Sequence, residues 1–165
     1  MKPAPSETLL NMDFDQKVVI DTNRREWIPS PSPGVWRKPL AREEAERGHT
    51  TSIVRFDPGS CFSRHEHPLG EEILVLDGTF SDELGDYGPG TYFRNPPGSG
   101  HSPFSKDGCI LFVKLDQFSP EDTTPVRVEL RNVQPATRLS DPPLTTINAS
   151  PEAVHCTAMS RMGRW

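Results

Sequence analysis

Three histidines and one glutamate are spaced along this sequence in a way that suits a single metal ion. His65 and His67 are separated by one residue, Glu71 follows four positions after His67, and His101 comes after two further strand-like runs. Because residues i and i+2 of a β-strand point to the same face, the two neighbouring imidazoles can bind one ion from one strand. After a turn at Pro68–Gly70, Glu71 opens the next strand and offers a carboxylate. A fourth ligand from a third strand would complete the set.

This ligand set limits the metals that it would hold. Imidazole nitrogens suit Zn, Cu, Fe and Ni, while a carboxylate adds a hard oxygen donor. We expect Fe(II) or Zn(II), with Ni, Mn or Co as alternatives. Zinc can be closed off by four protein ligands as a structural site, whereas a larger coordination number leaves positions for water, substrate or oxygen. The residues alone do not decide between these two uses.

The elements that must position these ligands read as short strands separated by turns. Strands are predicted over Thr51–Phe56, Cys61–His67, Glu71–Phe80, Thr91–Arg94 and Cys109–Leu115. Strands this short, with Gly- and Pro-containing turns between them, are typical of an all-β barrel or sandwich.

Further strands are expected on both sides of this region. They are predicted over Lys17–Asp21, Pro125–Val133 and Ala153–Met162. The chain then divides into an N-terminal arm (1–48), a core with all four ligands (49–118), and a C-terminal polar linker with covering strands (119–165).

The spacing around the ligands resembles the two motifs of the cupin superfamily. The first motif is Gly59, five residues, His65-x-His67, three residues, Glu71, six residues, Gly78; the second is Gly90, five residues, Pro96-x-Gly98, two residues, His101. Ser105 stands where the family usually has Asn, which is a departure outside the ligand set. Beyond these motifs, the sequence of residues 50–117 is similar to the cupin-like domain of ChrR-type anti-sigma factors. It is also similar to stand-alone relatives that include diketone-cleaving and dihydroxyacetophenone-type dioxygenases.

The resemblance implies a single-domain jelly-roll barrel (RmlC-like) that holds one divalent metal ion through His65, His67, Glu71 and His101. It implies two functions: a metal-dependent, non-haem-iron-type dioxygenase acting on a small carbonyl or enol compound, or a non-catalytic zinc-binding sensor or ligand-binding module. We lean toward the enzyme. The anti-sigma factors carry a separate zinc-binding domain with a His-x3-Cys-x2-Cys motif. Because this sequence contains no Cys-x2-Cys, binding of a sigma factor is not expected.

The direction of each side chain in these strands gives further expectations. If Glu71 points inward, Glu72 is a solvated charge on the outer face, where Leu74 and Leu76 also lie. Two outward leucines need a cover, either from the arm of residues 17–40 or from a second subunit, so a homodimer is expected. Tyr92 and Arg94 share one face of their strand and are candidates for lining the pocket. Strand alternation is lost before His101, so their direction stays open.

Composition excludes several classes of partner. Asp and Glu (23) outnumber Lys and Arg (18) and no basic block occurs, which argues against nucleic acid. No apolar run is long enough to span a membrane, and the first residues lack a signal peptide. The three widely spaced cysteines favour free thiols in a reducing compartment. We therefore expect a cytoplasmic protein whose partners are a small molecule and a second copy of itself.

Overall fold

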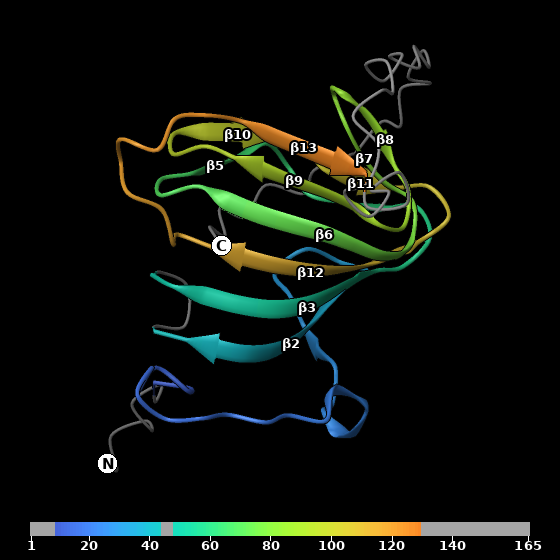
Figure 1. Cartoon of the computed structure of the whole chain (residues 1–165). Helices are drawn as coiled ribbons and strands as arrows, with labels where there is room; N and C mark the ends of the chain where they lie inside the picture. Colours follow the sequence, from blue (N-terminus) through green and yellow to red (C-terminus); the bar gives the residue numbers. More distant parts are fainter. Residues whose placement is uncertain (1–8, 44–47, 130–165) are drawn as a thin grey trace, which may run out of the picture.

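The computed structural model describes residues 9–43 and 48–129, and this part of the chain consists almost wholly of antiparallel strands. A curved seven-stranded sheet has the order β1-β2-β3-β12-β6-β9-β13 (Figure 1). Its strands are β1 (Ile28–Pro29), β2 (Val35–Arg42), β3 (Thr50–Phe56), β6 (Glu71–Gly78), β9 (Thr91–Asn95), β12 (Cys109–Leu115) and β13 (Val126–Glu129).

Two smaller sheets complete the structure. One has the order β4-β11-β7-β8 and the other pairs β10 with β5. Their strands are β4 (Ser60–Cys61), β5 (His65–His67), β7 (Phe80–Asp82), β8 (Gly85–Tyr87), β10 (Ser99–His101) and β11 (Phe104–Ser105). Apart from the short 3-10 helix η1 (Thr22–Arg24), the described residues form no helix, and so they include no helix long and apolar enough to cross a membrane. The all-β prediction is confirmed.

The core lies against the inner face of the large sheet. Every second residue is buried from Glu71 to Val75 of β6 and from Cys109 to Leu115 of β12, because successive side chains of a strand point to opposite faces. Phe80, from the four-stranded sheet, is 1% exposed and packs its ring against Phe56 and Phe93 at centroid distances of 5.9 and 5.7 Å. The other buried apolar side chains are Val35, Val54, Phe62, Ile73, Val75, Tyr87, Cys109, Leu111, Val113 and Leu115.

Gly78 forms the corner where the chain leaves the large sheet for the four-stranded one. Its φ is +71°, a conformation that side chains other than glycine rarely adopt. A Cβ at this position would lie 2.1 Å from the carbonyl oxygen of Gly108. The single long strand expected over Glu71–Phe80 is therefore two strands, β6 and β7, in different sheets.

Other differences from the predicted elements are local. Lys17–Asp21 is not a strand; Val19 is 82% exposed, and no strand of the described residues pairs with this segment. The expected ligand strand Cys61–His67 is divided into β4 and β5. Cys109 is buried and free, but Cys61 is disulfide-bonded, so the prediction of a free thiol is wrong for Cys61. The strand expected over Ala153–Met162 lies outside the described residues.

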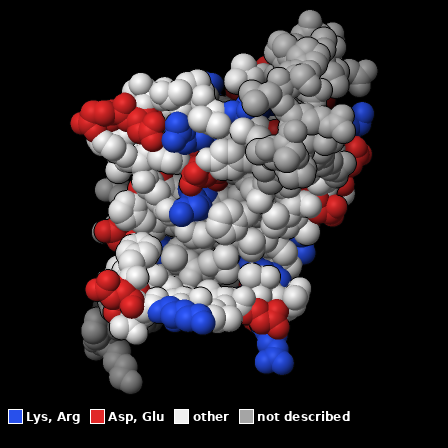
Figure 2. Space-filling view, in the orientation of Figure 1, with Lys and Arg blue, Asp and Glu red and all other residues white. Residues whose placement is uncertain are grey.

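The outer face of the large sheet is only partly covered by the N-terminal arm. Trp27 lies against Lys38 of β2 and Arg55 of β3, with the cations 4.5 and 4.8 Å from its ring centroid. Leu76 of β6 is 45% exposed. The described part of the arm therefore does not cover this leucine, and the expectation that it would is wrong. Charges of both signs are interspersed on the face shown in Figure 2, with a broad uncharged area between them.

Candidate metal centre

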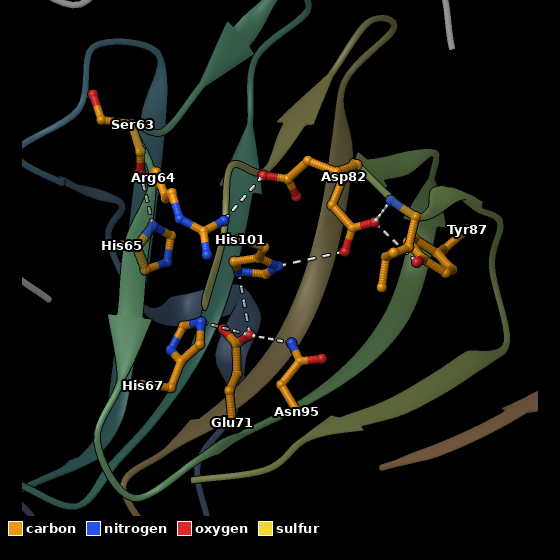
Figure 3. A network of polar contacts seen from close by, with 11 residues as sticks. Ser63, Arg64, His65, His67, Glu71, Asp82, Tyr87, Asn95 and His101 are labelled. Carbon is orange, nitrogen blue, oxygen red and sulfur yellow. Dashed lines mark hydrogen bonds and ion pairs between the residues drawn. The ribbon is translucent and has the colours of Figure 1, made fainter. Parts of the chain in front are cut away.

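The strand pair β5–β10 brings the three predicted histidines to one place inside the structure. His101 stands opposite His65 in the antiparallel register, and His67 lies two residues along the same face of β5. The three ring centroids are 4.9–5.1 Å apart. One nitrogen from each ring lies within 4.8 Å of the others. His67 and His101 are buried, and His65 is partly exposed (Figure 3).

Glu71 is the glutamate that faces these histidines. Its Oε2 lies 3.3 Å from Nε2 of His67 and 3.5 Å from Nε2 of His101, and the residue is 3% exposed. Asn95, its direct neighbour across the β6–β9 register, donates a hydrogen bond from Nδ2 to the same oxygen at 3.0 Å. The four predicted ligands thus come together from three strands.

The other polar candidates lie on the opposite face of the sheet. Glu72 accepts a hydrogen bond of 2.6 Å from the Tyr92 hydroxyl. Arg94 binds Asp122 at 3.1 Å and the carbonyl oxygen of Thr124 at 2.9 Å. Phe93 lies between Tyr92 and Arg94 and points into the core, so alternation sends both of its neighbours outward. The structure therefore does not bring Tyr92 or Arg94 into the histidine cluster.

The electrostatics of the cluster keep two imidazoles neutral and the carboxylate charged. Burial lowers the pKa of His65 to about 4 and lowers the pKa of His67. Burial acts to raise the pKa of Glu71, but the electrostatic interaction of its carboxylate with the His67 and His101 imidazoles outweighs burial and holds that pKa below its usual value. Burial acts to lower the pKa of His101, but the carboxylates of Glu71 and Asp82 raise it. Neutral imidazole and ionised carboxylate are the forms that bind metals.

The arrangement of the donor atoms suits binding of a metal ion better than hydrogen bonding among themselves. Nε2 of His67 and Nε2 of His101 are buried and make no hydrogen bond, although both lie close to the Glu71 carboxylate. Buried polar atoms that make no hydrogen bond are uncommon in proteins, and a bound ion is one explanation for them. Three imidazoles and a carboxylate are a donor set for Zn, Fe or Ni.

A small cavity adjoins the cluster on one side. The space that water can occupy in it is about 10 Å³, room for about one molecule. Three polar residues, His65, Glu71 and His101, line this cavity, and the rest of its wall is apolar. The lining residues are Val54, Phe56, His65, Glu71, Ile73, Phe80, His101, Pro103, Leu111 and Val113.

Sequence reasoning missed two polar residues that contact the cluster and a third that contacts one of these two. They are Asn95, which binds Glu71, Asp82, which lies 3.5 Å from Nδ1 of His101, and Tyr87, which donates a hydrogen bond to Asp82. The pairing of β6 with β9 would have placed Asn95 opposite Glu71. No periodicity pointed to Asp82, because it comes from a different sheet.

Comparisons with known proteins place this geometry in a family. The model of the ChrR cupin-like domain family matches residues 15–119. An RmlC-like cupin protein from Ralstonia eutropha JMP134 is 20% identical, with a TM-score of 0.54 over 61% of this chain and 68% of that one. A comparison of the sequence with curated proteins found no match.

Two further solved structures share the fold. An acetylacetone dioxygenase from Acinetobacter johnsonii is 22% identical, with a TM-score of 0.50 over 61% of this chain and 72% of that one. The anti-sigma factor ChrR, solved with SigE of Rhodobacter sphaeroides, is 22% identical, with a TM-score of 0.50 over 58% of this chain and 52% of that one. The chain thus spans about half the length of ChrR. The predicted RmlC-like jelly roll is confirmed.

Proposed function

This chain belongs to the ChrR cupin-like domain family, and we propose that it binds one divalent metal ion through His65, His67, Glu71 and His101. The observation that carries the proposal is the convergence of three imidazoles and a buried carboxylate, with Nε2 of His67 and of His101 facing Glu71 and making no hydrogen bond within the described residues. Fe(II) and Zn(II) are the metals that we propose, because both accept this donor set.

We further propose that the centre serves a dioxygenase-like enzyme whose substrate is a small carbonyl or enol compound. The apolar cavity supports this use, because it touches three of the four ligands and offers a position that no protein atom fills. A bound divalent ion would supply Lewis-acid polarisation of a substrate oxygen. The structural similarity to an acetylacetone dioxygenase agrees with a substrate of this class.

The residues of this chain have distinct parts in that proposal. The four ligands hold the ion, and the amide of Asn95 fixes the Glu71 carboxylate. The apolar wall leaves room for only about one water molecule, and this limited access of water strengthens electrostatic interactions at the centre. His65 is the most exposed of the ligands, so a small molecule would approach from its side.

Reconstitution tests the enzyme proposal. The metal-free protein is loaded anaerobically with Fe(II), and separately with Zn(II), and oxygen uptake is followed with β-diketones and hydroxylated aryl ketones. We expect uptake with iron that is lost in His101→Ala and kept in His49→Ala, a change at an exposed histidine outside the cluster. Elemental analysis of protein purified without added metal identifies the resident ion.

A zinc-binding sensor or ligand-binding module is the second candidate function. The match to the ChrR cupin-like family and the similarity to ChrR itself favour it. X-ray absorption of the zinc-loaded protein separates the two. Four protein ligands with no exchangeable position, and no turnover with either metal, would support the sensor and contradict the enzyme.

We also propose a homodimer formed through the outer face of the large sheet. Ile53, Phe112 and Leu74 stand side by side across β3, β12 and β6, and Leu76 extends this row as an exposed apolar residue. Light scattering should give a dimer for the wild type and a monomer for Leu76→Lys. Leu84→Lys, at an exposed leucine between β7 and β8, is the matched control and should remain a dimer.

A further inference from the structure

Asp82 is a buried carboxylate whose two oxygens have different tasks. It is 4% exposed and ends strand β7. Its Oδ1 accepts hydrogen bonds from the Leu84 backbone N–H at 2.8 Å and from the Tyr87 hydroxyl at 2.9 Å. Its Oδ2 faces Nδ1 of His101 at 3.5 Å (Figure 3). The two donors fix the carboxylate, so only Oδ2 is turned toward the imidazole.

This arrangement determines which imidazole nitrogen carries the hydrogen. A carboxylate oxygen only accepts hydrogen bonds, so it favours a hydrogen on Nδ1 of His101. The lone pair of a neutral imidazole is then on Nε2, the nitrogen that faces Glu71 at 3.5 Å. We propose that Asp82 is a positioning residue that keeps His101 in the tautomer able to bind the metal through Nε2. This inference rests on the metal centre of the proposed function.

His65 is positioned in the same way, but its partner is a backbone carbonyl group. Its Nδ1 lies 3.0 Å from the carbonyl oxygen of Ser63, which likewise leaves Nε2 for the centre. A backbone carbonyl cannot be removed by substitution, whereas the carboxylate of Asp82 can. Partners of this kind fix the ring and raise its basicity, and their loss typically costs 10–100-fold in metal affinity.

Asp82→Asn is an informative variant because it keeps the shape and changes the hydrogen-bonding pattern. The side-chain oxygen of the variant is needed by two donors, Leu84 N–H and the Tyr87 hydroxyl. Its NH₂ group must therefore face His101, and this donor favours Nδ1 as an acceptor with the hydrogen on Nε2. The variant thus selects the tautomer that cannot bind through Nε2.

Two measurements test the inference. Zinc affinity by competition titration should fall about 10–100-fold in Asp82→Asn. It should be unchanged in Asp86→Asn, which loses the same charge on the exposed part of the same hairpin. Nitrogen-15 NMR of the metal-free proteins at alkaline pH should show His101 with its hydrogen on Nδ1 in the wild type and on Nε2 in Asp82→Asn.

The outcomes separate this inference from the proposed function. Wild-type protein that binds no zinc overturns the metal centre, while the tautomer of metal-free His101 still tests the role of Asp82. Equal zinc affinity of Asp82→Asn and wild type, or wild-type His101 with its hydrogen on Nε2, overturns the inference. Should Asp82→Asn fail to fold, Tyr87→Phe removes one donor from Oδ1 and keeps the charge. It should give a smaller loss of zinc affinity, and wild-type affinity in Tyr87→Phe would count against the inference.

Discussion

Glu71 and Glu72 are adjacent in the sequence and lie in opposite environments. Glu71 is buried at the inner face of β6, beside two histidines and Asn95. Glu72 lies on the outer face and accepts a hydrogen bond from Tyr92. Each glutamate accepts a hydrogen bond from a side chain of β9: Asn95 lies directly opposite Glu71, whereas Tyr92 reaches Glu72 from the position opposite Leu74.

The difference between the two faces shows that strand alternation, and not residue type, assigns the chemistry. The inner face gathers three imidazoles and a carboxylate that together can bind a cation, and all of these side chains except His65 are buried. The outer face carries ordinary surface pairs such as Arg94 with Asp122. Surface pairs of this kind contribute little to stability. Changing matched residues on the two faces should therefore have unequal effects.

The largest difference is expected for metal binding by Glu71→Ala and Glu72→Ala. At a free metal concentration of 100 times Kd, the metal should stabilise the wild type by about 2.7 kcal/mol. Glu72→Ala should keep this gain, and Glu71→Ala should lose it because a ligand is missing. Denaturant unfolding with and without Zn(II) measures the gain. Equal behaviour of the two variants would mean that the two faces do not differ in metal binding.

Core packing gives the next largest contrast. Phe80 is fully buried among three aromatic rings, whereas Phe112 lies on the outer face of β12. Phe80→Ala should lower the free energy of unfolding by about 3–5 kcal/mol, because it leaves a cavity. Phe112→Ala should cost less, since part of that ring is already in contact with solvent. The comparison is made by urea unfolding of the metal-free proteins.

The pH dependence of the metal-free protein should come largely from the inner face. The pKa of His65 falls from 6.5 to about 4 on folding, and the pKa of His67 also falls. Their contribution is present above pH 6.5 and is lost as the pH falls toward 4, because the unfolded chain takes up these protons first. The pKa of His101 is raised, so its contribution is present below pH 6.5 and is lost as the pH rises through its folded pKa.

Unfolding midpoints between pH 7 and pH 4 check this expectation. His65→Gln should make the decline shallower, because the substituted side chain does not titrate. A wild type that grows more stable over the same range would show that the raised pKa of His101 dominates instead.

The smallest effect is expected at the outer pair. Tyr92→Phe removes the hydrogen bond to Glu72 and should cost about 1 kcal/mol of unfolding free energy. Metal affinity should not change, because the hydroxyl points away from the histidines. A clear loss of zinc affinity in Tyr92→Phe, in the same competition titration, would connect the two faces.

The sequence was sufficient where alternation and motif spacing act together. Cys109–Leu115 was predicted as a strand and forms one with the same bounds. The inward direction of Glu71 followed from the same reasoning, as did the outward direction of Leu76. In these strands successive side chains point to opposite faces, so the direction of one residue gives the direction of its neighbours in the same strand.

Features that depend on contacts between sheets were not accessible in this way. Asp82 approaches His101 because the chain changes sheet after Gly78, and no local pattern encodes that path. The direction of Tyr92 and Arg94 required the register of β9 against β6. Lys17–Asp21 has the composition of a strand but does not form one, and no sheet edge in the described part of the chain pairs with it.

The corner at Gly78 has a consequence for how sequences of this kind can diverge. Any side chain there meets the Gly108 carbonyl oxygen at a distance that atoms do not tolerate, and it also meets an unfavourable φ. Since Asp82 follows four residues later, movement of this corner would displace the carboxylate from His101. A saturation library at position 78 should therefore yield glycine alone among folded, zinc-binding clones. Exposed position 86 should accept many residues. Selection for metal retention would therefore remove variation at Gly78, although this residue never touches the metal.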